Sequence, residues 1–183
     1  DKVIDIFKSF PNKNIICVVD IAYLDFAGEA HAYRAFLKKL SGLPHHILPL
    51  IAFSASKGFT MYGMRCGALL CMAPTADLAK EFRDAASVAS RASWSNGNHS
   101  AMAVISKIFA DDALLAKVTD ERNHYMQILQ ERGRAFMEEA DKIGLKCCPY
   151  DSGFFITVPC ENAEEVGKAL QARNVFAIPL GPG

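Results

Sequence analysis

The sequence has 183 residues, of which 51% are hydrophobic, and its 20 basic side chains balance 20 acidic ones. This length can bury a sizeable core, and the hydrophobic content excludes a disordered chain. A net charge of zero argues against a general binder of nucleic acids or anionic membranes. No apolar run approaches the roughly 20 residues that a transmembrane helix needs.

The first half of the sequence predicts strands that alternate with helices. A helix is expected over Val3–Phe10, where apolar residues recur at helical spacing, and a strand over Ile15–Val19. A second helix over Glu29–Leu40 is followed by strands over Ile47–Phe53 and Gly67–Met72. Short, continuous apolar runs are typical of strands that are buried on both faces. The alternation predicts an α/β fold with a largely parallel sheet.

The middle of the sequence is mainly helical. Helices are expected over Asp77–Ser90 and Ser100–Phe109, with a polar turn between them. Helical spacing then continues over Asp112–Ile143. This stretch is far longer than the ordinary helix of roughly 11–12 residues, and such helices commonly connect two domains.

The C-terminal part predicts a small α+β unit. Strands over Phe154–Val158 and Val175–Ile178 would flank a helix over Ala163–Arg173. We therefore expect part of a large domain, a linking helix and an incomplete small domain, over residues 1–111, 112–143 and 144–183. The first residues are already in helical rhythm without an initiator methionine, so we expect a segment of a longer chain.

The cysteines and histidines do not form a recognisable framework. Cys17, Cys66 and Cys71 lie in apolar runs, no C-x-x-C motif is present, and the five histidines are scattered. We expect reduced cysteines that pack as small core residues, no metal site, and a cytoplasmic protein.

Polar side chains follow two of the predicted strands at the points where these strands end. Asp20 comes directly after the first strand, with Tyr23 three residues later, and Ser54-Ala55-Ser56-Lys57 follows the second. The next residues lead through Arg65 into the third strand. In open α/β sheets, ligands bind in the crevice outside the carboxyl ends of the strands. An acid, a phenol, a lysine, two hydroxyls and an arginine could therefore face one crevice.

Three blocks of this sequence resemble a known family. They are Asp20-Ile21-Ala22-Tyr23, Ser54-Ala55-Ser56-Lys57 through Tyr62-Gly63-Met64-Arg65-Cys66-Gly67, and Arg91-Ala92-Ser93-Trp94-Ser95-Asn96. Their order and spacing are similar to those of the fold-type I, pyridoxal-phosphate-dependent aminotransferases of the aspartate and aromatic group. The resemblance spans essentially the whole chain, as the second half of such an enzyme. It implies the mostly parallel sheet of the large domain, a long linking helix and a small α+β C-terminal domain.

The resemblance also implies a role for each polar residue. Lys57 would form the Schiff base with pyridoxal 5'-phosphate and then move a proton during the reaction. Asp20 would pair with the pyridine nitrogen, and Tyr23 would donate to the ring oxygen. The phosphate would be bound by a guanidinium and two hydroxyls, those of Arg65, Ser54 and Ser56. From the residues alone, Asp20 could instead cap a turn, Tyr23 could pack, and Ser56 could support the turn.

Three positions depart from the family's usual signature. Thr60 stands where glycine, serine or a small aliphatic residue is expected, Cys66 replaces an aliphatic residue, and Trp94 replaces a frequent tyrosine. The family's phosphate loop and ring-stacking aromatic residue belong to its first half. The arginine that grips the substrate α-carboxylate normally follows the last strand, so no residue of this sequence is assigned to that role.

Arg91 carries the expectation about the substrate. It stands where aspartate-type relatives place an arginine that reaches the neighbouring subunit's site, and a guanidinium can hold a side-chain carboxylate by two parallel hydrogen bonds. The alternative is that Arg91 ends an Ala-rich helix, where a cation interacts favourably with the helix dipole.

The resemblance therefore predicts a cytoplasmic, homodimeric enzyme of amino acid metabolism. It would transfer an amino group between an amino acid, either aspartate, glutamate or an aromatic one, and a 2-oxo acid. Neither a nucleic acid nor a membrane is expected as a partner. Two alternatives stay open: a pyridoxal-phosphate-dependent lyase of the same fold, and a non-catalytic fragment that acts as a dimerisation module.

Overall fold

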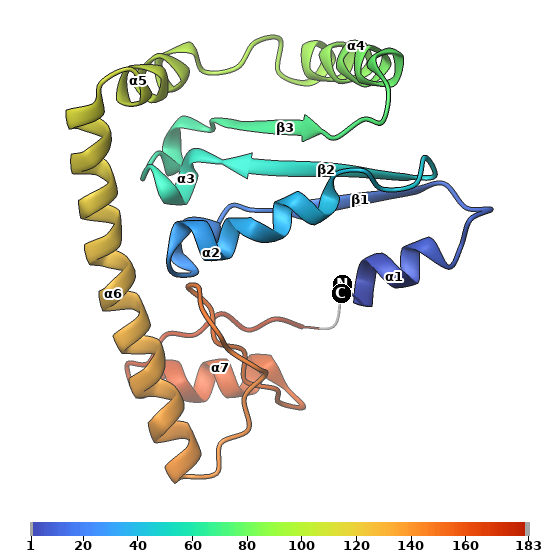
Figure 1. Ribbon diagram of the computed structural model, residues 1–183. Coiled ribbons are helices and arrows are strands. Elements are labelled where there is room, and N and C mark those ends of the chain that lie inside the picture. Colours follow the sequence, from blue (N-terminus) through green and yellow to red (C-terminus); the bar gives the residue numbers. More distant parts are fainter. Residues whose placement is uncertain (1, 182–183) are drawn as a thin grey trace. The chain divides into compact units, whose positions relative to one another are not determined.

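The computed structural model describes residues 2–181 and contains a mixed three-stranded sheet (Figure 1). The strands are β1 (Ile15–Asp20), β2 (Ile47–Ser54) and β3 (Gly67–Cys71), in the order β1-β2-β3. β1 and β2 are parallel, as predicted, whereas β3 runs antiparallel to β2. The alternation of elements did not predict this reversal. Residues 55–66 turn back at the end of β2, and their two short helices cannot carry the chain to the other end of the sheet.

The predicted helices are present with small shifts of their ends. Glu29–Leu40 starts as α-helix and continues as a 3₁₀ helix. Side-chain caps fix the starts of three longer helices, since Thr75, Asn98 and Asn162 each accept a backbone N–H of the first turn, and Glu29 and Ser54 cap two shorter helices in the same way. The helices are α1 (Lys2–Lys8), α2 (Ala30–Arg34), α3 (Ala55–Gly58), α4 (Ala76–Ser93), α5 (His99–Phe109), α6 (Asp112–Lys142) and α7 (Ala163–Gln171), with 3₁₀ helices η1 (Leu24–Phe26), η2 (Ala35–Leu40) and η3 (Tyr62–Met64).

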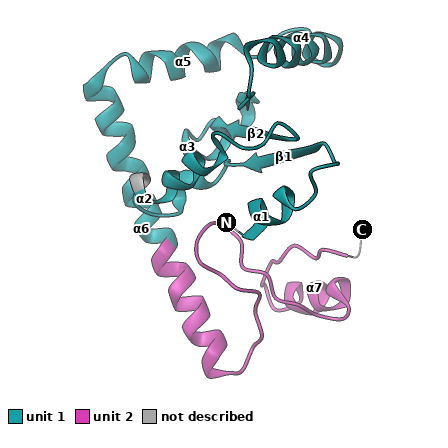
Figure 2. Cartoon of the chain, turned by 45° about the vertical axis from the view of Figure 1, so that its right-hand side comes forward, with its two compact units in different colours: residues 1–129 teal, residues 130–183 magenta. Residues whose placement is uncertain are grey.

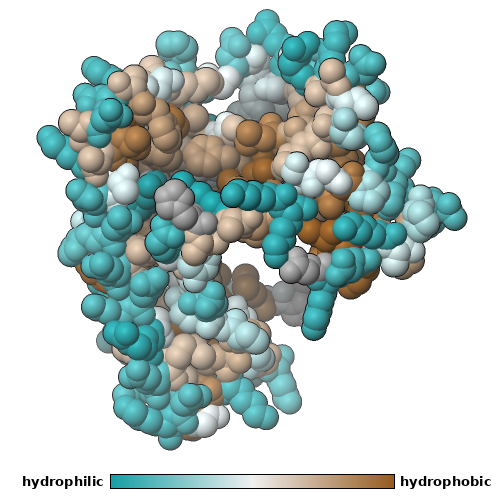
Figure 3. Space-filling model, in the orientation of Figure 1, coloured by the Kyte–Doolittle hydropathy of each residue, from teal (hydrophilic) through white to brown (hydrophobic). Residues whose placement is uncertain are grey.

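The core of the sheet lies on β2. Ile47, Pro49 and Leu50 are buried there, as expected for a strand covered on both faces. β1 differs from this expectation, because its residues alternate and Ile16 and Val18 are 65% and 61% exposed. Hydrophobic surface accordingly gathers around the sheet in the space-filling view (Figure 3). No helix of the described residues is long and apolar enough to cross a membrane.

The chain divides into two compact units, residues 1–129 and 130–183, with the boundary inside α6 (Figure 2). In the second unit Tyr150 packs against Gly133, where an added Cβ would lie 2.6 Å from the phenol oxygen. The strands predicted over 154–158 and 175–178 are wrong, because these residues lie outside any helix or strand. An apolar run forms a strand only beside a partner, and the described residues of this unit contain none.

Candidate functional site

The ends of β1 and β2 and the start of β3 meet at one edge of the sheet. Asp20 is the last residue of β1 and lies opposite Ala52, and Ser54 ends β2. Gly67 opens β3 opposite Ser54. Figure 1 shows α3, which contains Lys57, directly beyond this end of β2. The edge therefore collects the polar residues that follow the predicted strands.

The Lys57 amine is flanked by two tyrosine rings. Its Nζ lies 4.3 Å from the centroid of the Tyr62 ring and 5.6 Å from that of the Tyr23 ring. A cation within about 6 Å of a ring centroid is attracted by the electrons of the ring face. Tyr23 is one of the predicted site residues, whereas no role was predicted for Tyr62. The position of Tyr62 between Lys57 and Arg65 was the feature of the sequence that could have indicated a role in the site.

Arg65 approaches the same Tyr62 ring. Its guanidinium carbon lies 5.6 Å from the ring centroid, and Nη1 donates to the Tyr62 carbonyl oxygen at 3.0 Å. The Tyr62 ring thus connects the amine of Lys57 with the guanidinium of Arg65. These two cationic groups make the turn suitable for an anionic ligand.

The backbone of this turn is unusual. Arg65 has a φ of 50° and Thr60 a φ of 53°, both in the left-handed region that residues with side chains seldom adopt. Thr60 is the position where the family signature expects a smaller residue, so its conformation gives a physical reason for that preference. Such conformations cluster at functional sites, where surrounding contacts hold them in place.

Ser54 links the strand to the turn. Its Oγ accepts a hydrogen bond from the backbone N–H of Ser56 at 3.2 Å and thereby caps α3. Because the oxygen acts as acceptor, the hydroxyl proton of Ser54 is available to a ligand. Ser56 takes part through its backbone, and a phosphate-binding role for its hydroxyl stays a prediction.

Asp20 forms a turn at the end of β1. Its Oδ1 accepts a hydrogen bond from the Ala22 N–H at 2.9 Å. This is the turn contact that the residues alone suggested as an alternative to ligand binding. A carboxylate can accept several hydrogen bonds, so the contact orients the Asp20 side chain and leaves it able to bind a further donor.

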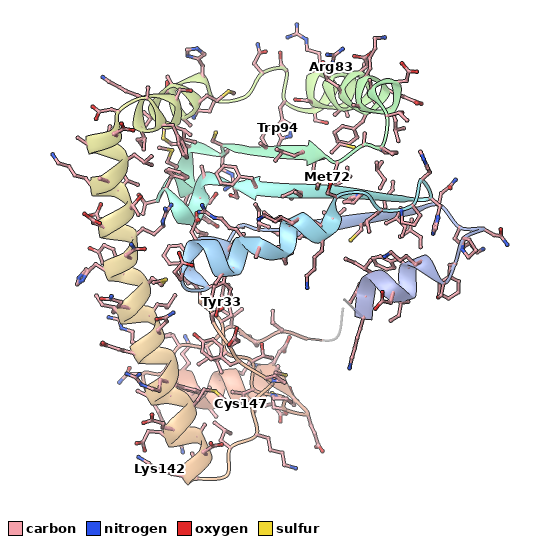
Figure 4. All side chains as sticks on the ribbon, viewed as in Figure 1. Tyr33, Met72, Arg83, Trp94, Lys142 and Cys147 are labelled. Atoms are coloured by element: carbon pink, nitrogen blue, oxygen red, sulfur yellow. The ribbon has the colours of Figure 1, made fainter. Side chains whose placement is uncertain are left out.

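Arg91 lies apart from this group. It is exposed in the last turn of α4, and its Nη1 donates to the Ser95 carbonyl oxygen at 3.4 Å. Within residues 2–181, no interaction joins Arg91 to Lys57 or Arg65. Trp94 lies in the same segment between α4 and α5 and is 74% exposed (Figure 4). The contact agrees with the helix-end alternative, and the substrate role stays a prediction.

Asn98 connects the segment after α4 to the site. Its Nδ2 donates to the Met64 carbonyl oxygen at 2.9 Å, while its Oδ1 accepts from the Ala101 N–H at 3.2 Å and caps α5. Met64 directly precedes Arg65, so Asn98 supports the turn that carries the guanidinium. Sequence reasoning missed this residue, although an asparagine before a helix is a recognisable cap signal.

The family is decided by comparison with known proteins. The model of the class I and II aminotransferases matches residues 1–182. The chain belongs to this family. The aromatic-amino-acid aminotransferase of Escherichia coli K12 is 31% identical over 139 residues, which cover 72% of this chain and 33% of that relative. The family predicted from the three sequence blocks is therefore confirmed.

Solved structures agree with the fold of this family. A crystal structure of an aminotransferase from Anaerococcus prevotii matches with a TM-score of 0.93 and 32% identity, covering 100% of this chain and 45% of that one. An aromatic-amino-acid aminotransferase from Burkholderia pseudomallei, covalently bound to pyridoxal phosphate, matches with a TM-score of 0.75 and 19% identity over 97% of this chain and 44% of that one. The predicted α/β fold class is confirmed. The chain spans about a third of the curated relative and just under half of these solved proteins.

Proposed function

We propose that this chain carries the cofactor-binding residues of a pyridoxal-phosphate-dependent aminotransferase. The observation that carries the proposal is that the Lys57 amine lies between the rings of Tyr23 and Tyr62, while the Arg65 guanidinium lies beside the same Tyr62 ring. The family match over residues 1–182 supports it. The Burkholderia protein, whose fold is similar, binds pyridoxal phosphate covalently, and this supports a site of the same kind here.

The donor set at this edge fits the chemical groups of the cofactor. Pyridoxal phosphate presents an aldehyde, a phosphate, a ring nitrogen and a ring oxygen. The edge offers an amine on Lys57, a guanidinium on Arg65, a carboxylate on Asp20, a phenol on Tyr23 and a hydroxyl on Ser54. Arg65 uses one N–H on the Tyr62 carbonyl, so its other donors are available to an anion.

Each residue has a distinct task in this proposal. Lys57 holds the cofactor covalently through its amine and then carries the proton that leaves and returns at the substrate Cα. Asp20 keeps a proton on the ring nitrogen, and Tyr23 donates to the ring oxygen. Arg65 and Ser54 bind the phosphate by charge-assisted hydrogen bonds. The bound cofactor supplies an electron sink for the bond that breaks at Cα.

The proposed reaction moves an amino group from an amino acid to a 2-oxo acid. We propose aspartate, glutamate or an aromatic amino acid as the donor, and the aromatic-amino-acid aminotransferase of Escherichia coli is a relative that supports the aromatic alternative. Arg91 would bind the side-chain carboxylate of an acidic donor. The proposal includes a homodimer in the cytoplasm, and the free thiols of all six cysteines agree with a reducing compartment.

The substitution Lys57→Ala in the full-length protein tests this function. We expect loss of the visible absorbance that the wild type gains with pyridoxal phosphate, loss of transamination, and unchanged folding, because the Lys57 side chain is only half-buried and is not part of the hydrophobic core. The control is Lys80→Ala, which removes an exposed lysine of α4. After borohydride reduction, peptide mass spectrometry should place the cofactor on Lys57.

Retained turnover in Lys57→Ala would contradict the proposal. Omitting the acceptor 2-oxo acid tests the reaction type. A transaminase then stops after one turnover of the bound cofactor, whereas continued product formation would indicate a lyase. Light scattering of the purified protein tests the dimer.

A further inference from the structure

A partly buried ion pair lies beside the turn that carries Lys57. The Asp25 Oδ2 is 3.4 Å from the Arg122 Nη1, and the two side chains are only 16% and 15% exposed. The other oxygen of Asp25 accepts a hydrogen bond from the more exposed Arg34. Asp25 belongs to η1 and Arg122 to α6, so the pair connects distant parts of the sequence within the first unit.

The Asp25 carboxylate touches the residue that follows Lys57. A Cβ added to Gly58 would lie 2.4 Å from the Asp25 Oδ2, closer than atoms can approach. Gly58 is buried, and its backbone conformation is open to any residue. A side chain at this position would therefore have to displace the carboxylate, which occupies that space.

The guanidinium of Arg122 faces the next residue of the turn. Its carbon lies 5.8 Å from the centroid of the Phe59 ring, within the range of a cation–π contact. The Phe59 ring also lies 6.0 Å from the Phe109 ring of α5 and 6.3 Å from the Phe53 ring of β2. Phe59 is thus held between a strand, a helix and a cation.

The same short segment that carries Asp25 also carries Tyr23. Tyr23 immediately precedes η1, and its ring lies 5.6 Å from the Lys57 amine. This segment therefore contacts two neighbouring residues of the turn: Tyr23 lies beside the amine of Lys57, and Asp25 lies beside the backbone of Gly58. A shift of Asp25 would move both contacts together.

We propose that Asp25, held by Arg122, is a positioning residue that fixes the backbone of the Lys57 turn and the ring of Tyr23 relative to the Lys57 amine. The inference rests on the proposed function, because it concerns the orientation of the amine that would bind the cofactor. A reactive side chain that is held in the productive orientation reacts faster than one that samples many orientations. Breaking a partly buried pair by removing one partner leaves the other charge uncompensated, so the arrangement depends on both.

The experiment uses three variants of the full-length protein. Asp25→Asn keeps the shape and removes the charge, and Arg122→Lys keeps the charge and loses the planar fork. Asp84→Asn is the matched control, since Asp84 pairs with Lys80 on the exposed face of α4. We measure hydrogen exchange of cofactor-free protein, visible circular dichroism of the cofactor-loaded protein, and kcat and KM separately.

Both cluster variants should accelerate exchange in residues 55–66 by at least about fivefold, with β2 unchanged. The circular dichroism per bound cofactor should fall, and kcat should drop about tenfold or more at a KM within about threefold of wild type. A role in global stability alone would lower Tm and raise exchange throughout the sheet, which contradicts the proposal.

A second pair of variants keeps the test decisive if Asp25→Asn fails to fold. Gly58→Ala should reproduce the loss of kcat, because its Cβ displaces the carboxylate. In an Asp25→Ala background the same Gly58→Ala change should add little, since the obstructing oxygen is gone. Additive effects would overturn the inference.

The outcomes separate this inference from the function on which it rests. If Lys57→Ala abolishes turnover while Asp25→Asn and Arg122→Lys behave as Asp84→Asn, the positioning role is wrong and the aminotransferase function stands. If Lys57→Ala retains turnover, the proposed function fails whatever the Asp25 variants do.

Discussion

Arg65 lies in one connecting segment and Arg91 lies just before another, and the protein holds the two segments in different ways. Residues 55–66 connect two paired strands, and the ladder of β2 and β3 fixes both ends of this turn. Residues 94–98 connect the helices α4 and α5 and are exposed throughout. Arg65 contacts the same tyrosine ring as Lys57, whereas Arg91 donates a hydrogen bond to the Ser95 carbonyl oxygen, just after its own helix.

Paired strands at both ends stabilise the backbone of a site. Hydrogen bonds inside the first turn, such as Thr60 N–H to the Lys57 carbonyl at 3.1 Å and Met61 N–H to the Ala55 carbonyl at 3.2 Å, hold its backbone in one shape. Within the described part of the chain, the segment after α4 is not paired with a strand, and the side chain of Asn98 is its contact with the first turn. We therefore expect the first turn to be organised within this chain, and the second to depend on what packs beside it.

The largest effect is expected at the strand-anchored edge, from Asp20→Ala. The cofactor should still attach through Lys57, while kcat falls severely, because an unprotonated ring nitrogen is a poor electron sink. A fall of less than about tenfold, or ~1.4 kcal/mol of transition-state stabilisation, would exclude the ring-nitrogen role. Visible absorbance and steady-state kinetics make the measurement. Asp120→Ala, at an exposed position of α6, serves as the control.

The next effect concerns the helix-end segment and Arg91→Ala. If Arg91 binds a substrate carboxylate, kcat/KM for aspartate should fall by at least ~2 kcal/mol more than kcat/KM for phenylalanine, because desolvated charge pairs are costly to break. Arg83→Ala removes an arginine of the same helix and should change neither value (Figure 4). Equal losses for both donors would make Arg91 a helix cap and leave the substrate class open.

The secondary structure shows which features a sequence can predict. Periodic apolar residues were sufficient for β1, β2 and the long α6, because each pattern is local. The runs 154–158 and 175–178 have the same apolar character and form no strand. A strand is completed by its neighbour, and apolar character alone does not supply one.

The candidate site divides in the same way. Lys57 and Arg65 were found from a motif, since their spacing is a property of the chain. Asn98 contacts Met64, which lies 34 positions away in the sequence. Arg122 contacts Asp25, which lies 97 positions away. No local pattern encodes such contacts, so they become visible only when the fold brings the residues together.

Asn98→Ala tests the contact that connects the two segments. Loss of the cap on α5 should cost about 1 kcal/mol of stability. Loss of the Met64 contact should also loosen the Arg65 turn and weaken the binding of pyridoxal phosphate a few-fold. Asn162→Ala removes an equivalent cap on α7 in the second unit and should lower stability without changing cofactor affinity. Equal cofactor affinity in both variants would mean that the two segments are independent.

The smallest effect is expected from glycine substitutions at the left-handed residues of the two segments. Thr60 has a φ of 53° and Ser95 a φ of 67°, so both side chains occupy a region that glycine adopts without penalty. Relief of this strain is worth about 1–3 kcal/mol, and the greater freedom of glycine in the unfolded chain removes about 0.4–1 kcal/mol of it. Thr60→Gly and Ser95→Gly should therefore both raise the free energy of unfolding by ~1 kcal/mol, with Thr60 gaining more because its side chain is β-branched.

The two substitutions should differ in their effect on the reaction. Thr60 N–H binds the Lys57 carbonyl, so glycine there frees the backbone that carries the amine, and kcat should fall severalfold despite the higher stability. Ser95→Gly changes a segment that has no contact with Lys57 among the described residues, so kcat should stay at the wild-type value. Thermal denaturation and kcat measured on the same preparations give both quantities. If Ser95→Gly lowered kcat as much as Thr60→Gly, strain would matter equally in both segments, and the strand ladder would not be the source of the difference.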